Sequence, residues 1–363
     1  MAGSRPTVGV GVIGCGRVAE TRHLPALAAL PQARVVAVAD VDPHRLTRVA
    51  DRFGVAARYA DFRRLLDLPS LDAVAVCVPA AFHGEVALAV LDAGRHLLVE
   101  KPLALTLDDA DRLIERAGRS AVRATVGFNL RQHALVRRAR TMIEGGGLGA
   151  VEAIRTALTS ATRFERDLPE WRSRRERGGG ALFEMAVHHF DLWRFLLGAE
   201  VDEVFATSRS DGWHDGVTTV TARLGDGGLA STVVLEGTAA SNEVDVYGSG
   251  GHLRASLYRF DGLEVSPVSG SAGDLRARLG GVARSVTSVP AAVSALRGGG
   301  VWAGSYRAQW SHFLDCIRDG VAPGCTLVDG RRALEVALAA AQSASVGRPV
   351  SVGAAPRRIP AVT

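Results

Sequence analysis

The sequence contains a single lysine, Lys101, although lysine and arginine together number 43. Arginine stays protonated at any working pH, whereas a buried lysine can lose its proton, so the two are not interchangeable in acid–base chemistry. A lysine kept at one position is therefore a candidate acid, base or carbonyl polariser. The alternative is that an arginine-rich composition left one lysine by chance.

Cysteine is also scarce, and the cysteines form no C-x-x-C pair, so the sequence predicts neither disulfides nor a metal site. This favours a reduced, cytoplasmic setting. No apolar stretch is long enough to span a bilayer, and no basic-then-apolar leader precedes the first predicted strand, so we expect no membrane partner and no export. The four cysteines are Cys15, Cys77, Cys316 and Cys325.

A concentrated basic surface is missing as well. The formal net charge is +5, but the arginines are spread along the chain and no basic run is interleaved with aromatic residues. We therefore expect no nucleic-acid partner. With 363 residues, of which 47% are hydrophobic, the chain is long enough for two domains.

The N-terminal region begins with strand, glycine turn and helix. An apolar run at residues 8–13 is followed by a G-x-G-x-x-[G/A] motif and a helical stretch that ends near Leu30. In this motif Gly14 permits the tight turn, Gly16 lets a pyrophosphate approach the backbone, and Ala19 packs the helix on the strand. The predicted dinucleotide contacts here are Gly14, Cys15, Gly16, Arg17, Val18 and Ala19.

Asp40 ends a second predicted strand, 21 residues after Ala19. A carboxylate at this position accepts hydrogen bonds from an adenosine ribose and repels a 2′-phosphate, which favours NAD over NADP. The alternative is that Asp40 caps the helix that begins near Pro43, although Asp42 could fill that role instead.

Strands and helices continue to alternate. Strands are predicted at 71–78, 96–99 and 123–128, and helices at 82–93 and 107–117, the second with a T-x-x-D cap beginning at Thr106. This order predicts a doubly wound parallel sheet, a Rossmann domain of residues 1–128. Val78 and Pro79 end one strand at the edge where ligands bind. His83 follows them, as a cofactor contact or as a solvated histidine at a helix start.

Glu100 and Lys101 follow the short buried strand 96–99, and Pro102 rigidifies the exit. They therefore lie at the carboxyl edge of the predicted parallel sheet, where open α/β sheets bind ligands. This context favours a chemical role for Lys101 over chance survival.

The pattern changes after the glycines at 145–147. Period-two alternation at 151–162, 217–224, 229–238, 244–247 and 253–258 predicts a largely antiparallel sheet in an α+β domain of residues 129–345. Residues 266–304 are ambiguous between an arm with helical spacing and a surface segment. Helices are predicted at 306–318 and 331–344, and an extended tail at 346–363.

A helix predicted at 181–197 carries a second candidate for acid–base chemistry. Glu184 and His188 are four residues apart and so share a face, which suits a general base held in one tautomer by a carboxylate. The glycines at 178–180 would admit a ligand. The alternatives are an exposed helical ion pair, a core histidine, or a zinc site with His189 and Asp191, for which no fourth-ligand logic is evident.

Taken together these motifs resemble the Gfo/Idh/MocA family, which includes glucose-fructose oxidoreductase and inositol 2-dehydrogenase. The resemblance implies a Rossmann domain, a C-terminal open-sheet domain that forms a homodimer or homotetramer, NAD as cofactor, and hydride transfer to or from a sugar, cyclitol or sugar derivative. The stretches that carry it are Gly14 to Ala19, Asp40, Glu100-Lys101-Pro102, Gly127-Phe128-Asn129 and Glu184 to Asp191, in the family's order from about Val8 to about Gly320.

The resemblance also implies residue roles. Lys101 corresponds to the family's active-site lysine, His188 to its usual catalytic histidine, and Glu184 to an aspartate four residues earlier. Glutamate in place of that aspartate is a departure, as is Ala186 where the family often has glycine. The remaining predicted cofactor contacts are Asp40, Val78, Pro79, His83, Glu100, Lys101 and Asn129; the predicted substrate contacts are Lys101, Asn129, Trp171, Arg172, Glu184 and His188.

The predicted activity is NAD-dependent oxidation or reduction of a polyol, sugar or sugar-nucleotide substrate. One alternative is a hydrolase or lyase in which bound NAD is reduced and reoxidised within each turnover. Another is a dinucleotide-sensing binding protein without catalysis.

The densest basic stretch, residues 171–177, leads into the glycines before Glu184. We expect Arg172 to contact the substrate, and Arg174, Arg175 and Arg177 to matter only for a phosphorylated or nucleotide-linked substrate, because guanidinium groups bind phosphate bidentately. The alternative is a solvated loop whose arginines pair with nearby carboxylates.

Overall fold

The chain separates into two units, each built around its own sheet. The computed structural model describes residues 7–166, 168–259, 261–268, 300–355 and 357–358. The first unit comprises Met1–Asn129 with Tyr306–Leu334, and the second comprises Leu130–Ser305 with Glu335–Thr363.

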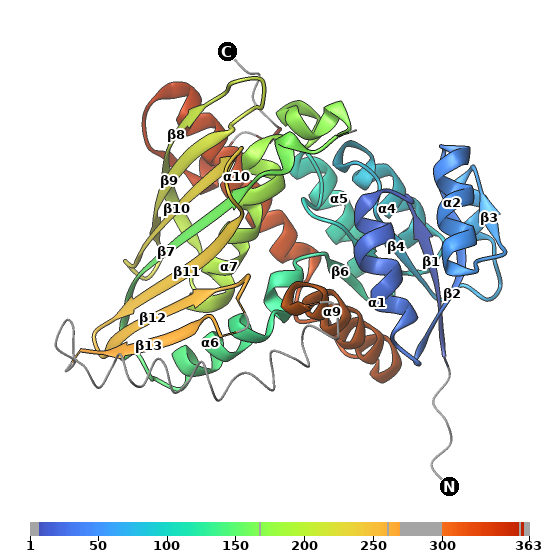
Figure 1. Cartoon of the computed structure of the whole chain (residues 1–363), viewed down its shortest axis with the longest axis horizontal. Coiled ribbons are helices and arrows are strands. Elements are labelled where there is room, and N and C mark those ends of the chain that lie inside the picture. Colours follow the sequence, from blue (N-terminus) through green and yellow to red (C-terminus); the bar gives the residue numbers. More distant parts are fainter. Residues whose placement is uncertain (1–6, 167, 260, 269–299, 356, 359–363) are drawn as a thin grey trace, which may run out of the picture. The chain divides into compact units, whose positions relative to one another are not determined.

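The first unit contains a six-stranded parallel sheet in the order β3-β2-β1-β4-β5-β6 (Figure 1). Every residue of β1 and β4 is buried, which is why these strands read as continuous apolar runs rather than as alternating ones. The strands are β1 (Val8–Ile13), β2 (Ala33–Ala39), β3 (Arg58–Tyr59), β4 (Ala73–Val76), β5 (His96–Val99) and β6 (Ala124–Val126).

Side-chain caps begin several of the first unit's helices. Asp42 caps α2, Asp61 caps α3, and the Thr106 hydroxyl accepts the Asp109 N–H at the start of α5, as the T-x-x-D pattern predicts. The helices are η1 (Ala19–His23), α1 (Leu24–Ala28), α2 (Pro43–Phe53), α3 (Phe62–Leu66), η2 (Ala80–Phe82), α4 (His83–Asp92) and α5 (Leu107–Gly118), followed by η3 (Asn129–Gln132) at the boundary.

A segment from late in the chain completes the first unit. Helices α9 (Gly300–Asp319) and α10 (Leu327–Val346) contribute residues 306–334. Trp310 and Phe313 are buried there, and the hydroxyl of Thr125 in β6 donates a 2.7 Å hydrogen bond to the carbonyl of Cys325. The N-terminal part of the first unit ends at Asn129, close to the predicted boundary. Residues 306–334, however, belong to the first unit and not to the second domain, for which the range 129–345 was predicted. A helical pattern shows that a face is buried without showing which core buries it.

The second unit contains an eight-stranded sheet in the order β13-β12-β11-β7-β10-β9-β8-β14. Only β7 and β10 pair in parallel among these strands, so the predicted largely antiparallel sheet is confirmed. The strands are β7 (Val151–Ser160), β8 (Val201–Arg209), β9 (Val217–Leu224), β10 (Leu229–Glu236), β11 (Ser241–Gly248), β12 (Gly251–Ser256), β13 (Leu263–Pro267) and β14 (Val350–Ser351).

Helices α6 and α7 pack against this sheet, and β9 alternates buried and exposed residues as expected for a sheet with one covered face (Figure 1). Most residues of α7 are buried. The helices of the second unit are α6 (Ala134–Glu144), η4 (Thr162–Phe164), η5 (Glu170–Ser173), η6 (Arg175–Arg177), η7 (Leu182–Ala186), α7 (Val187–Leu197) and η8 (Val352–Ala354), with the end of α10.

Several elements differ from the predictions. Short elements such as α3, and longer ones such as α6 and β8, were not predicted. The tail was predicted to be extended, and it adds β14 to the sheet beside β8. The predicted helical spacing at Leu275, Leu279, Val282 and Val286 lies outside the described residues. In the part of the chain that the structure describes, none of the helices has the length and apolar character needed to cross a membrane.

Candidate functional site

The glycine turn after β1 borders open space at the carboxyl end of the sheet. Gly14 has φ +92°, and a Cβ there would lie 2.6 Å from the carbonyl oxygen of Cys77, so only glycine fits. At Gly16 no heavy atom lies within 4 Å of where a Cβ would be, and Ala19 is fully buried. This geometry fits a pyrophosphate that approaches the backbone N–H groups at the start of a helix.

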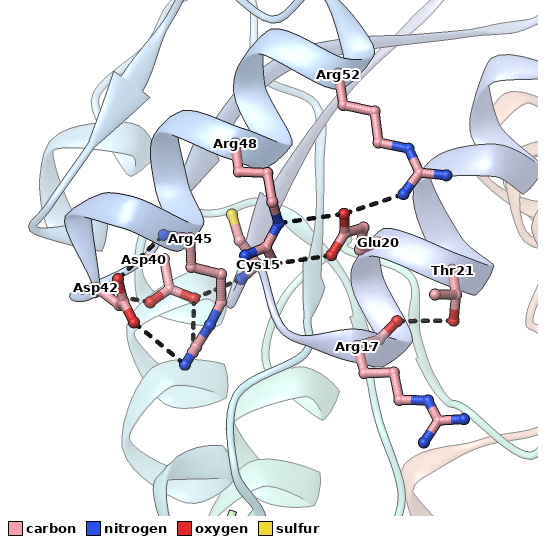
Figure 2. Close-up of polar contacts among 9 residues, drawn as sticks. All are labelled: Cys15, Arg17, Glu20, Thr21, Asp40, Asp42, Arg45, Arg48 and Arg52. Carbon is pink, nitrogen blue, oxygen red and sulfur yellow. Dashed lines mark hydrogen bonds and ion pairs between the residues drawn. The ribbon is translucent and has the colours of Figure 1, made fainter. Parts of the chain in front are cut away.

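Asp40 lies directly after β2, beside this turn (Figure 2). Its Oδ2 accepts a 2.7 Å hydrogen bond from the backbone N–H of Cys15, and its Oδ1 accepts a 2.8 Å bond from that of Asp42. Arg45 lies 3.4 Å from Oδ2. Asp42, not Asp40, caps α2, so the capping alternative for Asp40 is wrong. The Asp40 carboxylate is thus held at the strand end by two backbone N–H groups, one from the glycine turn and one from the chain that follows β2.

A second ion-pair cluster joins η1 to α2 (Figure 2). The Glu20 carboxylate lies 2.9 Å from Arg48 and 3.0 Å from Arg52, both on α2. These hydrogen bonds lower the pKa of Glu20 against a smaller opposing effect of burial. Arg17 is exposed and Val18 is half-buried.

Val78 and Pro79 lie half-buried after β4, and His83 is 1% exposed. The Nδ1 atom of His83 is 2.7 Å from the carbonyl oxygen of Pro102, and Nε2 is 2.9 Å from that of Val78. Burial lowers the pKa of His83. The predicted alternative of a solvated histidine is therefore wrong, because this ring joins the chain after β4 to the chain after β5.

Glu100 and Lys101 follow β5, next to β4 in the same parallel sheet. Glu100 is 5% exposed; its Oε2 accepts the Lys101 backbone N–H at 3.1 Å, and its Oε1 lies 2.8 Å from Nε2 of His23. Burial acts to raise the pKa of Glu100, but the His23 hydrogen bond and the positive charge of Lys101 outweigh it and hold that pKa below its usual value. A buried carboxylate thus stays ionised beside the lysine. Asn129, after β6, is fully buried.

In the second unit, Glu184 and His188 lie on consecutive helical elements. Glu184 is in η7, a five-residue π-helix, and the 8% exposed His188 is in the first turn of α7. Single π-turns within helices are frequent at functional sites. The Nε of Arg172 donates a 2.7 Å hydrogen bond to Oε1 of Glu184, and a terminal nitrogen of Arg172 pairs with the same oxygen. Arg172, predicted as a substrate contact, is therefore also the carboxylate's partner.

The glycines before Glu184 lie against the backbone of other segments of the chain. A Cβ at Gly179 would lie 2.2 Å from the carbonyl oxygen of Trp171, and one at Gly180 would lie 2.8 Å from that of His214. Close packing against the backbone of Trp171 and His214 therefore explains these two glycines, where the sequence predicted the approach of a ligand.

The other arginines of this loop divide into two kinds. Arg175 is 5% exposed and forms a bidentate pair with the fully buried Asp215, its Nε lying 2.7 Å from Oδ2. Arg174 makes an exposed contact of 3.4 Å with Glu170. The solvated-loop alternative thus holds for Arg174, whereas Arg175 is a core residue.

Two of the side chains in the zinc alternative, those of His189 and Asp191, have other partners. His189 lies 3.1 Å from both Thr232 and Asn242, and burial lowers its pKa to about 4. Asp191 forms a buried bidentate pair with Arg131. Among the described residues, no group of three or more histidine, cysteine or acidic side chains could hold a metal ion.

No sequence motif marks Glu236, which ends β10 and is 3% exposed. Its carboxylate accepts the backbone N–H of Arg163 at 3.3 Å. Burial, and then the negative charge of Glu184, raise its pKa. A glutamate at the end of an alternating strand gives no signal of this kind, because the charge that affects it lies 52 residues away in sequence.

Two models of one protein family match the chain. The model described as "Oxidoreductase family, NAD-binding Rossmann fold" matches residues 8–128, and the model described as "Oxidoreductase family, C-terminal alpha/beta domain" matches residues 140–352. The chain belongs to the Gfo/Idh/MocA oxidoreductase family. The resemblance seen in the sequence, the two-part fold, NAD as cofactor and the class of NAD-dependent oxidoreductase are thereby confirmed.

Individual relatives span nearly the whole chain. The myo-inositol 2-dehydrogenase of Thermotoga maritima is 30% identical over 350 residues, which cover 94% of this chain and 98% of that protein. The structure of GenD2 from gentamicin A biosynthesis in complex with NAD has a TM-score of 0.79 at 26% identity, covering 95% of this chain and 96% of that one. The structure of levoglucosan dehydrogenase in complex with NADH and levoglucosan has a TM-score of 0.83 at 22% identity, covering 95% of this chain and 99% of that one, and this likeness shows the fold alone.

Proposed function

We propose that this protein oxidises or reduces one hydroxyl-bearing carbon of a cyclitol, sugar or sugar derivative, with Lys101, His188 and Glu184 as its catalytic residues. The observation that carries the proposal is the placement of the sole lysine. Lys101 follows β5 at the same sheet edge as the glycine turn after β1, beside a buried, ionised Glu100. The activity in the name of the Thermotoga maritima relative supports the substrate class.

NAD supplies the hydride acceptor or donor when it is bound. The groups that would hold it are the backbone of Gly14 to Ala19 at the pyrophosphate and Asp40 at the adenosine ribose. Val78, Pro79, His83, Glu100, Lys101 and Asn129 form or support the edge where the nicotinamide end would lie.

In the oxidative direction His188 takes the hydroxyl proton. Glu184, held by Arg172, stabilises the imidazolium that forms. Lys101 donates a hydrogen bond to the oxygen as it becomes a carbonyl, and reduction reverses these roles. Asn129 and Trp171 contribute to substrate binding in this proposal, with Arg172 adding donors from the five that a guanidinium carries.

The decisive experiment is a panel of inositols, free sugars and nucleotide sugars, each incubated with NAD, and their keto forms with NADH. Stoichiometric NADH formation supports the proposed dehydrogenase. Release of a free sugar without net NADH would replace it with the internal-redox hydrolase, and binding of NADH without any turnover would replace it with the sensing protein.

The same panel tests the charge of the substrate. Arg175 is committed to Asp215, so Arg174 and Arg177 are the loop arginines that would recognise a phosphate. For an anionic substrate we expect KM to rise steeply with salt, because exposed charges are screened within about 10 Å at 0.1 M. A salt-independent KM would assign a neutral cyclitol or free sugar.

Asp40 sets the cofactor preference in this proposal, and Asp40→Asn is expected to lower the NAD-to-NADP ratio of kcat/KM by about tenfold or more. The amide oxygen keeps the hydrogen bond from Cys15, while the charge that repels a 2′-phosphate is lost and Arg45 remains nearby. The measurement is kcat/KM for each cofactor with one panel substrate.

Asp42→Asn is the matched control, because Asp42 also pairs with Arg45 but makes the cap of α2. Asparagine caps helices as well as aspartate does, so we expect little change in stability and none in cofactor preference. An equal shift in both variants would mean that general charge, rather than Asp40, sets the preference.

We also propose a homodimer or homotetramer formed through the sheet of the second unit. The support is apolar exposure at alternate positions of this sheet, where Phe205, Leu229, Val233 and Tyr247 are 37% to 58% exposed.

A cytoplasmic location is proposed because all four cysteines are buried free thiols.

A further inference from the structure

A buried polar chain in the first unit joins three distant segments. His23 is the last residue of η1, Glu100 follows β5, and Trp310 lies in α9. His23 and Trp310 are fully buried and Glu100 is 5% exposed. The proposed mechanism uses neither His23 nor Trp310.

The directions of the hydrogen bonds fix the proton on His23. The indole nitrogen of Trp310 can only donate, and it lies 3.0 Å from Nδ1 of His23. Nδ1 must therefore accept, which leaves the ring neutral with its proton on Nε2. That proton points to Oε1 of Glu100 at 2.8 Å.

Aromatic packing holds the same ring in place. Tyr306 and Trp310 both meet His23 edge-on, at centroid distances of 5.3 and 5.9 Å and interplanar angles of 85° and 88°. Rotation of the imidazole would break both ring contacts and both hydrogen bonds, so the donor to Glu100 is fixed.

Glu100 passes this constraint to Lys101. Its second oxygen accepts the Lys101 backbone N–H at 3.1 Å, so the carboxylate is fixed by a donor at each end. On its other side Gly127 makes room for this carboxylate, since a Cβ there would lie 3.0 Å from the carboxylate carbon. Loss of the His23 donor would leave a buried anion short of a partner and free to turn.

We propose that His23, held in one tautomer by Trp310, is a positioning residue that places Lys101 through the carboxylate of Glu100. The inference rests on the proposed catalytic use of Lys101. It also links the helix after the glycine turn to the lysine, so that one device aligns the cofactor-binding backbone with the acid–base group.

Two substitutions of His23 separate this role from packing. A glutamine amide nitrogen falls near the position of Nε2, so His23→Gln keeps the donor to Glu100 and loses the acceptor for Trp310. The side-chain amide group of asparagine falls near the position of Nδ1, so His23→Asn keeps an acceptor, the amide oxygen, for Trp310 and loses the donor to Glu100. Both remove the ring.

Lys101 is the only lysine, so full-length protein grown with carbon-13-labelled lysine gives one lysine side-chain signal in an NMR spectrum. We expect that signal to move toward the unfolded-peptide position in His23→Asn and to stay near its parent position in His23→Gln. With a panel substrate, kcat should fall at least about tenfold in His23→Asn and less than about threefold in His23→Gln, with NADH affinity unchanged.

A signal that moves equally in both variants, or in neither, would overturn the proposal. Trp310→Phe should move it in the same direction as His23→Asn, and an unmoved signal would show that Trp310 does not hold the tautomer. The NMR result needs no turnover, so it decides the positioning role even if Lys101→Arg proves fully active and the proposed function fails.

Discussion

Lys101→Arg is expected to bind NADH with near-normal affinity and to lose at least about a hundredfold in kcat, because removal of a positioned acid or base typically costs 10²–10⁴-fold. Arginine keeps the positive charge beside the buried Glu100 carboxylate, so we expect this variant to fold. It cannot release a proton at working pH, and its planar fork does not match a compact ammonium donor. The measurement is kcat with a panel substrate, together with NADH binding by fluorescence.

Lys101→Met is the companion variant, since it also removes the charge. If Lys101 served only to neutralise Glu100, arginine would retain activity and methionine would lose it. Comparable losses in both variants, with NADH binding intact, assign proton or hydrogen-bond chemistry to the lysine. More than half of the parent kcat in Lys101→Arg would remove Lys101 from the mechanism.

Local sequence signals were sufficient to place the candidate residues at the carboxyl edge of the first unit's sheet. The glycine turn depends on Gly14 and Gly16, whose requirements are set by backbone geometry within a few residues. Asp40 and Lys101 were found because each follows a short apolar strand, and strand ends in a parallel sheet share an edge. Such features are predictable because period and position alone determine them.

The partners of those residues were not predictable. His23 meets Glu100 across 77 residues and Trp310 across 287, so no local pattern relates them. The same holds for residues 306–334, whose helical period was visible while their membership of the first unit was not. A helical pattern in the sequence indicates that one face of the helix is buried. Only the folded structure shows which residues that face packs against.

The loop at residues 171–177 shows what composition alone does not resolve. Its arginines form one basic stretch in the sequence, but their environments differ in the folded chain, where Arg172 belongs to η5, Arg175 belongs to η6 and Arg174 lies between the two turns. Arg172 meets Glu184, Arg174 faces solvent, and Arg175 enters the core. Charge density along a sequence therefore says little about charge on a surface.

Arg175→Ala is expected to lower the free energy of unfolding by about 3–5 kcal/mol, the usual cost of removing one partner from a buried ion pair. Asp215 is fully buried; besides Arg175, its Oδ1 accepts the Ser208 hydroxyl at 2.9 Å, and its backbone N–H donates to Ser210. Without the guanidinium this carboxylate keeps only weak compensation for its lost hydration. The midpoint of urea unfolding measures the change.

Arg174→Ala provides the comparison one residue away. Its guanidinium and the Glu170 carboxylate are both exposed, so this variant should lose less than about 1 kcal/mol. Comparable losses at the two positions would show that burial does not decide the strength of these pairs. A large loss of stability in Arg175→Ala and a small one in Arg174→Ala would also separate stability from substrate recognition. A rise in KM in Arg174→Ala at unchanged stability can then be assigned to a lost contact with an anionic substrate. Arg175→Ala cannot support that assignment, because it also destabilises the fold.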